Sequence, residues 1–136
     1  MKIFIICSKK FYDQIPSIKG SLEALDHIIT LPNCYDDPGT EDKYRQMGHL
    51  EHAKFKSEMI RHSEDVINAN DAVLVLNFTK NGVDNYIGGA TFLEMYDAFR
   101  LSKKIFMYND IPDGILKDEI IGFCPIVVKG DLGKIV

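Results

Sequence analysis

Two apolar runs without polar interruption constrain this chain more than any other feature. They are residues 3–6 (Ile-Phe-Ile-Ile) and 72–76 (Ala-Val-Leu-Val-Leu). A strand with one face in water alternates apolar and polar side chains, whereas a strand covered on both faces stays apolar throughout. Both runs are therefore expected to be central strands of a parallel sheet with helices on each face.

The rest of the chain supplies the other layers of such a fold. Five short segments rich in β-branched and aromatic residues predict strands at residues 2–7, 27–31, 72–78, 104–108 and 125–128. Helical segments are predicted between them at residues 14–25, 41–68, 90–102 and 115–123. The alternation of strands and helices is typical of an α/β domain.

An α/β chain with five strands commonly forms a flavodoxin-like, doubly wound parallel sheet in the order 2-1-3-4-5, with helices on both faces. Ligands of such sheets bind beyond the carboxyl ends of strands 1 and 3, where the winding reverses. The segments leaving these strands are residues 7–11 and 77–89. A ligand crevice is therefore expected between them.

The bulk composition limits the class of protein. A length of 136 residues fits one domain spanning 1–136, and 46% hydrophobic with 26% charged residues is typical of a globular protein. No segment approaches the ~20 apolar residues that span a bilayer, and Lys9 and Lys10 end the first apolar run before it reaches the length of a signal-peptide core, so we expect no entry into membranes. The odd number of cysteines favours the reducing cytoplasm. The 3 cysteines are far apart, which favours neither a disulfide framework nor a zinc site.

Charge points to a small ligand. The net charge is −4, and the lysines are scattered instead of forming a stripe. This distribution argues against a nucleic-acid polymer as partner. No residue pattern indicates a metal or a cofactor; the spacing of His49, His52 and His62 on one predicted helix is more typical of packing or surface residues.

The strongest local signal is a glycine pair at a helix start. Gly88 and Gly89 precede Ala90 and Thr91, where the unpaired N–H groups of a first helical turn and the helix dipole favour a sugar or phosphate oxygen. The competing interpretation is an ordinary turn, for which glycine is equally suited.

Glu94 lies one turn inside the same helix. On a helical wheel it shares a face with Ala90, Ala98 and Leu101, while Phe92, Met95 and Phe99 form a second apolar stripe. A carboxylate on an apolar face is costly unless it is paired or used, although a first-turn glutamate also stabilises a helix start. Apolar residues on two sides of one helix favour a homodimer.

These residues resemble the nucleoside 2-deoxyribosyltransferase-like family, which includes the deoxynucleoside monophosphate N-glycosidases. The resemblance covers most of the chain and depends on the strand at 71–77, the glycine loop leading to Glu94, Ala98 in the next turn, and residues 103–106. It implies a small nucleoside or nucleotide as the partner. It also implies that Glu94 is a nucleophile that forms a glycosyl-enzyme intermediate, which water or a second nucleobase resolves.

The sequence departs from the family at the second catalytic group. Relatives carry an aspartate eight residues before the aspartate that opens strand 3, and this position is Ser63 here. The neighbouring Glu64 is our candidate for the second carboxylate, although adjacent helix residues point ~100° apart, so the role requires a shift of the helix. The transferase aspartate six residues before the nucleophile falls on Gly88.

Three further residues are candidates for substrate binding. Ser8 follows strand 1 and offers a hydroxyl for a sugar or phosphate oxygen, or caps a turn. Asn77 ends strand 3 and either orients a substrate hydroxyl or closes the loop. Tyr86 precedes the glycine pair and either stacks on a base or is an ordinary loop tyrosine.

Two functions remain open at this point. The first is an N-glycosidase or deoxyribosyltransferase acting on nucleosides or nucleoside monophosphates through Glu94. The alternative is a non-catalytic nucleotide-binding or sensing domain on the same scaffold, because one fold hosts many functions and the second carboxylate is displaced.

Overall fold

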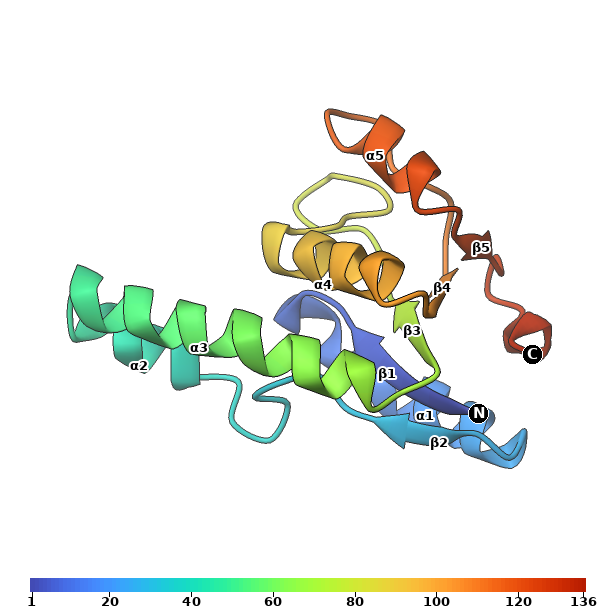
Figure 1. Cartoon of the computed structure of the whole chain (residues 1–136), viewed down its shortest axis with the longest axis horizontal. Helices are drawn as coiled ribbons and strands as arrows, with labels where there is room; N and C mark the ends of the chain where they lie inside the picture. Colours follow the sequence, from blue (N-terminus) through green and yellow to red (C-terminus); the bar gives the residue numbers. More distant parts are fainter.

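The computed structural model describes residues 1–136 and has a five-stranded, all-parallel sheet (Figure 1). The strands are β1 (Lys2–Ile6), β2 (Ile28–Thr30), β3 (Ala72–Val75), β4 (Lys104–Met107) and β5 (Ile126–Val127). Their order is β2-β1-β3-β4-β5, which confirms the predicted flavodoxin-like fold. Each predicted strand is present, but each is shorter than its apolar segment.

Helices cover both faces of the sheet, as expected for strands that are apolar on both sides. Successive residues of a strand point to opposite faces, so Ile3 and Ile5 pack under α1 (Ile15–Ala24). Phe4 and Ile6 lie in the other core layer, under α3 (His49–Asn68), α4 (Gly89–Arg100) and α5 (Lys117–Gly122). The chain buries one apolar cluster on each side of β1 and β3.

The helix predicted at residues 41–68 is wrong in one respect, because the structure divides it into α2 (Thr40–Gln46) and α3. The break occurs at Gly48, whose φ of 114° and ψ of 170° belong to a region that only glycine occupies readily. Two 3-10 helices, η1 (Lys9–Gln14) and η2 (Leu132–Lys134), were not predicted.

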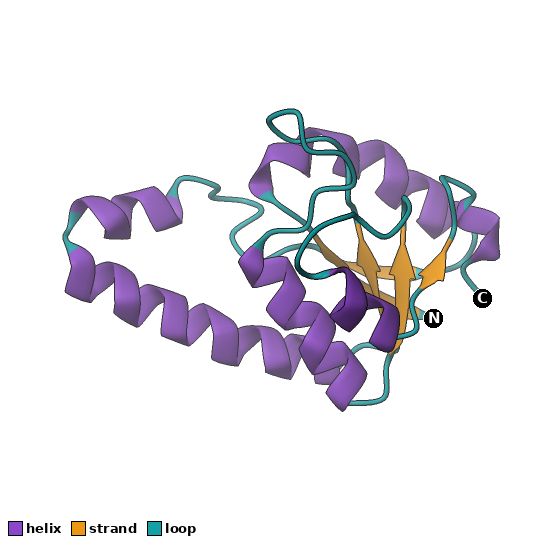
Figure 2. Ribbon diagram, turned by 90° about the horizontal axis from the view of Figure 1, so that it is seen from above, coloured by secondary structure: helices purple, strands orange, loops and turns teal.

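The break folds the chain back on itself. Figures 1 and 2 show α2 beside the first half of α3, and together they extend beyond the sheet; we call residues 40–58 the arm. Tyr44 of α2 stacks on Phe55 of α3 with ring centroids 4.8 Å apart, and α2 has no buried residue of its own. The arm is therefore held mainly by this stack and by surface charges.

α4 has two apolar sides, but not the two expected. Thr91, Met95 and Ala98 face the core, so Met95 belongs with Ala98 and not with the aromatic stripe. Phe92 and Phe99 instead pack around Phe123, each with ring centroids 5.5 Å from it. None of the helices combines the length and apolar character that crossing a membrane requires.

Candidate functional site

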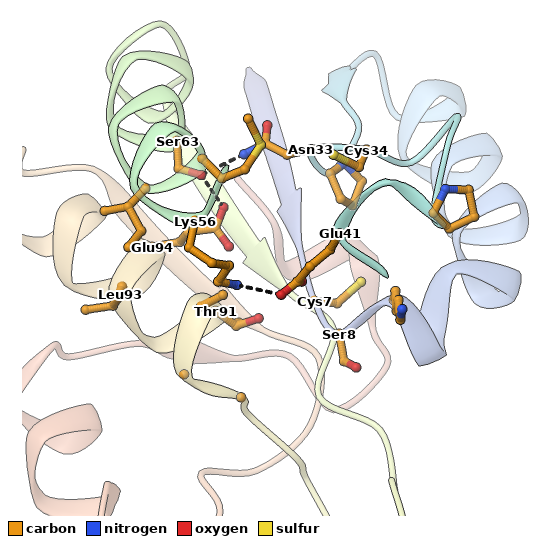
Figure 3. Close-up of a pocket in the computed structure, with 18 of the residues that line it drawn as sticks. Cys7, Ser8, Asn33, Cys34, Glu41, Lys56, Ser63, Thr91, Leu93 and Glu94 are labelled. Carbon is orange, nitrogen blue, oxygen red and sulfur yellow. Dashed lines mark hydrogen bonds and ion pairs between the residues drawn. The ribbon is translucent and has the colours of Figure 1, made fainter. Parts of the chain in front are cut away.

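A pocket of about 360 Å³ lies at the carboxyl end of β1, where the topology places a ligand (Figure 3). Its walls come from the end of β1, the loop before the arm, the arm itself, the middle of α3 and the first half of α4. Six residues predicted to form the site line it: Ser8, Tyr86, Gly88, Gly89, Thr91 and Glu94. The pocket therefore brings the glycine loop and the helix glutamate together with the end of strand 1.

Glu94 is held at the α3 side of this pocket by a chain of hydrogen bonds. Ser63 Oγ donates to Glu94 Oε2 at 3.0 Å, and Asn33 Nδ2 donates to Ser63 Oγ at 2.7 Å. Tyr12 extends the chain, since its hydroxyl donates to the Asn33 carbonyl at 3.1 Å. The carboxylate orientation is thus fixed from three separate parts of the chain.

The environment of Glu94 brings the pKa of its carboxyl group close to neutral pH. Burial raises the pKa of the carboxyl group to about 7, and the nearby Asp97 contributes in the same direction. The hydrogen bond from Ser63 and the charge of Lys56 act in the opposite direction. Both protonation forms of Glu94 are therefore populated near neutral pH, as suits a group that changes its proton or its bonding during a reaction.

The structure does not place Glu64 in the pocket. Its carboxylate forms an ion pair with Arg100 at 2.8 Å on the outer side of the α3 and α4 pair. Ser63, one position earlier, points at Glu94 instead, because adjacent residues of a helix diverge by ~100°. The helix is not shifted, so the prediction that Glu64 supplies the second carboxylate is not supported.

Asn77 also lies outside the pocket, and its amide is fully used elsewhere. Its Nδ2 donates to the carbonyls of Asn109 at 3.2 Å and Asp110 at 2.9 Å, while its Oδ1 accepts from the Asn109 N–H at 2.8 Å. The side chain is completely buried. The sequence left open whether Asn77 orients a substrate hydroxyl or closes the loop, and these hydrogen bonds show that it closes the loop.

The opposite end of the pocket carries a lysine, Lys80, that no sequence pattern had marked as a site residue. Lys80 Nζ donates to Ser8 Oγ at 3.2 Å and lies 4.7 Å from the centre of the Tyr86 ring. Lys80 forms no ion pair with a carboxylate, and no side chain caps the start of α4, whose N-cap residue is Gly88. This end of the pocket therefore presents a hydroxyl, a cation and free N–H groups, all suited to an anion or a sugar oxygen.

A second pocket carboxylate was missed because it sits on the arm. Glu41 Oε2 lies 2.9 Å from His52 Nε2, 3.2 Å from an Arg45 nitrogen and 3.4 Å from Lys56 Nζ. Partial burial alone would raise its pKa, but the His52 hydrogen bond and the charges of Lys56 and Arg45 outweigh it and lower the pKa. Only the glycine break at Gly48 could have revealed this residue, since an unbroken helix keeps position 41 far from the sheet.

The pocket cysteine beside Glu94 has a raised pKa. Burial, followed by the nearby charge of Glu94, raises the pKa of Cys7 to about 12. A thiol attacks as the thiolate, so this shift favours the protonated, unreactive form of Cys7 near neutral pH. No group of three or more His, Cys, Asp and Glu side chains is placed to hold a metal ion.

The pocket thus has Glu94, with a pKa near neutrality, on one side and the ionised Glu41 on the facing arm. Its remaining end, beside the start of α4, is suited to an anion.

No model of a known protein family matches the chain, and no curated protein matches it.

Proposed function

We propose that this protein cleaves or exchanges the N-glycosidic bond of nucleosides or nucleoside monophosphates, with Glu94 as the nucleophile. The observation that carries the proposal is the state of the Glu94 carboxylate inside the pocket. Ser63 holds Oε2, whereas Oε1 forms no hydrogen bond. One oxygen is thus oriented while the other is free to attack a carbon atom.

The attack is a retaining displacement. Glu94 Oε1 forms a bond to the anomeric carbon, and the bond to the base nitrogen breaks with its electron pair leaving on the base, which takes up a proton from solvent. The sugar then remains as an ester of Glu94 until water or another base replaces the carboxylate. A pKa of about 7 leaves enough ionised Glu94 for this step near neutral pH.

The distribution of polar groups supports a substrate with a sugar in the middle. Gly89 and Glu94 are five residues apart on α4, which corresponds to about 7.5 Å along a helix axis. A pentose can span this distance, with its anomeric carbon at Glu94 and its 5′ oxygen or phosphate near Ser8 and Lys80. A pocket of about 360 Å³ is also within the range of small-molecule sites.

The test is chromatography after incubation with each deoxynucleoside, ribonucleoside and their monophosphates, with and without a second free base. We expect release of the base from at least one substrate and a loss of about 10³-fold or more in Glu94→Gln. Glu64→Gln is the matched control, because Glu64 is paired with Arg100 outside the pocket. Full base release by Glu94→Gln would refute the proposal.

The alternative function, a non-catalytic nucleotide-binding domain, is favoured by one observation. Ser63 occupies the position where the resembled family has a carboxylate, and its hydroxyl satisfies Glu94 without supplying an acid. Under this alternative, calorimetry detects tight binding of a nucleotide, and no base is released over many hours.

We also propose that the protein is a homodimer through the outer face of α4 and α5. Phe99, Tyr96 and Ile121 are 49%, 47% and 51% exposed on this face. Exposed aromatic residues that gather around Phe123 are typical of an interface. Light scattering should give the dimer mass for the native chain and the monomer mass for Phe99→Glu.

A further inference from the structure

Glu41 and Glu94 line one pocket from opposing walls. Glu94 projects from α4, Glu41 projects from α2 of the arm, and Figure 3 shows Lys56 lying between them. Lys56 contacts Glu41 at 3.4 Å, and its charge is also felt by Glu94. The two carboxylates therefore face the same space from either side of a single lysine.

The two carboxylates are contacted from different turns of α3. On α3, Lys56 lies beside Glu41 and Ser63 holds Glu94. Lys56 and Ser63 are seven positions apart, which corresponds to about 10 Å along the helix axis. A sugar bound to Glu94 would present its opposite side to the arm.

The contacts of Glu41 fix one oxygen and leave the other open. His52 and Lys56 of α3 and Arg45 of α2 all contact Oε2, whereas Oε1 takes part in no hydrogen bond or ion pair. Asp42, the nearest other acid on α2, is itself paired with Arg45 and with Lys9. The contacts to Oε2 lower the pKa of Glu41 and keep it ionised. They also hold the carboxylate in place, so that Oε1 is free to accept a proton.

We propose that Glu41 is the general base that activates the water or other acceptor which resolves the glycosyl intermediate. This inference rests on the proposed function, because it requires an ester at Glu94. It gives Glu41 the role of second catalytic group that the sequence predicted for Glu64, whose carboxylate pairs with Arg100 outside the pocket.

The step is balanced in atoms and electrons. The acceptor atom, which is the oxygen of water or a nitrogen of a second base, forms a bond to the anomeric carbon while its proton moves to Glu41 Oε1. The bond from that carbon to Glu94 Oε1 breaks, and its electron pair restores the Glu94 carboxylate. Glu41 then releases the proton to solvent. The acceptor must enter from the face opposite the ester, which is the face the arm covers.

Asp97 is the other acid that lines the pocket, and it cannot serve this role. It lies three residues after Glu94 on the same helix, so both carboxylates approach from the same wall. Its side chain also pairs with Arg100 at 3.7 Å. Only Glu41 reaches the pocket from the opposite side.

The experiment is a burst measurement on the Glu41→Gln variant, with a substrate that the native protein cleaves. We expect one equivalent of base to be released per active site at a rate within a few fold of the native protein. Steady-state turnover should then fall by about 10² to 10⁴-fold. Intact-protein and peptide mass spectrometry should show the sugar attached to Glu94. Azide, which needs no base to attack, should restore turnover and give a glycosyl azide.

The matched control is Asp42→Asn, which removes the neighbouring α2 carboxylate that shares Arg45 but does not line the pocket. We expect native turnover in this variant. Native turnover in Glu41→Gln, or loss of the burst together with the steady state, would overturn the inference. Absence of base release by the native protein would instead show that the proposed function has failed, and the inference with it.

Discussion

The two walls of the pocket are built from different interactions. The wall that carries Glu94 is α4, whose inner side buries Thr91, Met95 and Ala98 against the sheet. The wall that carries Glu41 is α2, which buries no residue and is held by one aromatic stack and by the ion pairs of its acids with Lys9 and Lys56. The hydrophobic core fixes the position of one carboxylate, and surface charge fixes the other.

The difference shows how one fold shifts the pKa values of two carboxylates in opposite directions. Burial without a cation in contact raises the pKa of Glu94. Partial burial also acts to raise the pKa of Glu41, but the His52 hydrogen bond and the charges of Lys56 and Arg45 outweigh it and lower the pKa. Environments that separate the pKa values of two acids in one pocket also give them separate roles.

The largest expected effect is a difference in how much each wall contributes to the free energy of unfolding. Met95 is fully buried, so Met95→Ala leaves a cavity and should lower the free energy of unfolding by about 2 to 5 kcal/mol. Tyr44→Ala removes only the stack on Phe55 and should cost about 1 kcal/mol. Urea unfolding measures both. Equal losses would contradict the contrast between a core wall and a charged wall.

The second prediction uses the raised pKa of Glu94. Between pH 4.5 and about 7 the folded state keeps a proton that the unfolded state has lost, so stability falls as the pH rises across this window. The contribution is fully present below pH 4.5, and the total loss should be about 2 to 3 kcal/mol, reduced by the partial accessibility of the residue. Thermal unfolding of the native protein and of Glu94→Gln at matched pH measures it. A parallel pH dependence in the variant would exclude Glu94 as the source.

The third prediction concerns the break that creates the arm. Gly48 has a φ of 114° with open space around its α-carbon, so Gly48→Ala suffers from backbone strain and not from a clash. We expect a loss of about 1 to 2 kcal/mol. Gly20→Ala is the matched control, because Gly20 lies inside α1 with equally open space, and alanine there should stabilise by about 0.5 to 1 kcal/mol. Chemical denaturation that gave both substitutions the same sign would show that Gly48 is not under this constraint.

The smallest expected effect is a shift of the pH profile. The hydrogen bond from Ser63 lowers the pKa of Glu94, so Ser63→Ala should raise it further. If Glu94 acts as an ionised nucleophile, base release rises with pH through about 7 in the native protein. In Ser63→Ala the same rise should occur at a higher pH, by less than about one unit. A shift toward lower pH would contradict the direction of the hydrogen bond.

The sheet was predictable because its determinants are local. Unbroken apolar runs such as residues 72–76 need covering on both faces, and the alternation of strands and helices leaves few ways to connect them. The same rules located Ser8, Gly88 and Glu94 at one edge of the sheet, and the structure brings them into one pocket.

The arm was not predictable for an equally physical reason. Residues 41–68 have helical character throughout, and a single glycine inside a helical pattern is usually tolerated. Only the positive φ of Gly48 turns α2 back, and this brings Glu41 to the pocket. The partners of Glu64 and Lys80 likewise come from distant parts of the chain, Arg100 and Ser8, which no local pattern specifies.

The buried amide of Asn77 limits which substitutions can be accepted during evolution at the carboxyl end of β3. Asn77 offers its two amide hydrogens to carbonyls of residues 109 and 110 and its oxygen to the N–H of residue 109. Aspartate would direct an acceptor at two carbonyls, leucine would leave all three groups unsatisfied, and glutamine is one methylene too long. We therefore expect that only asparagine is accepted at position 77, and that substitutions in the neighbouring loops must preserve its three hydrogen bonds.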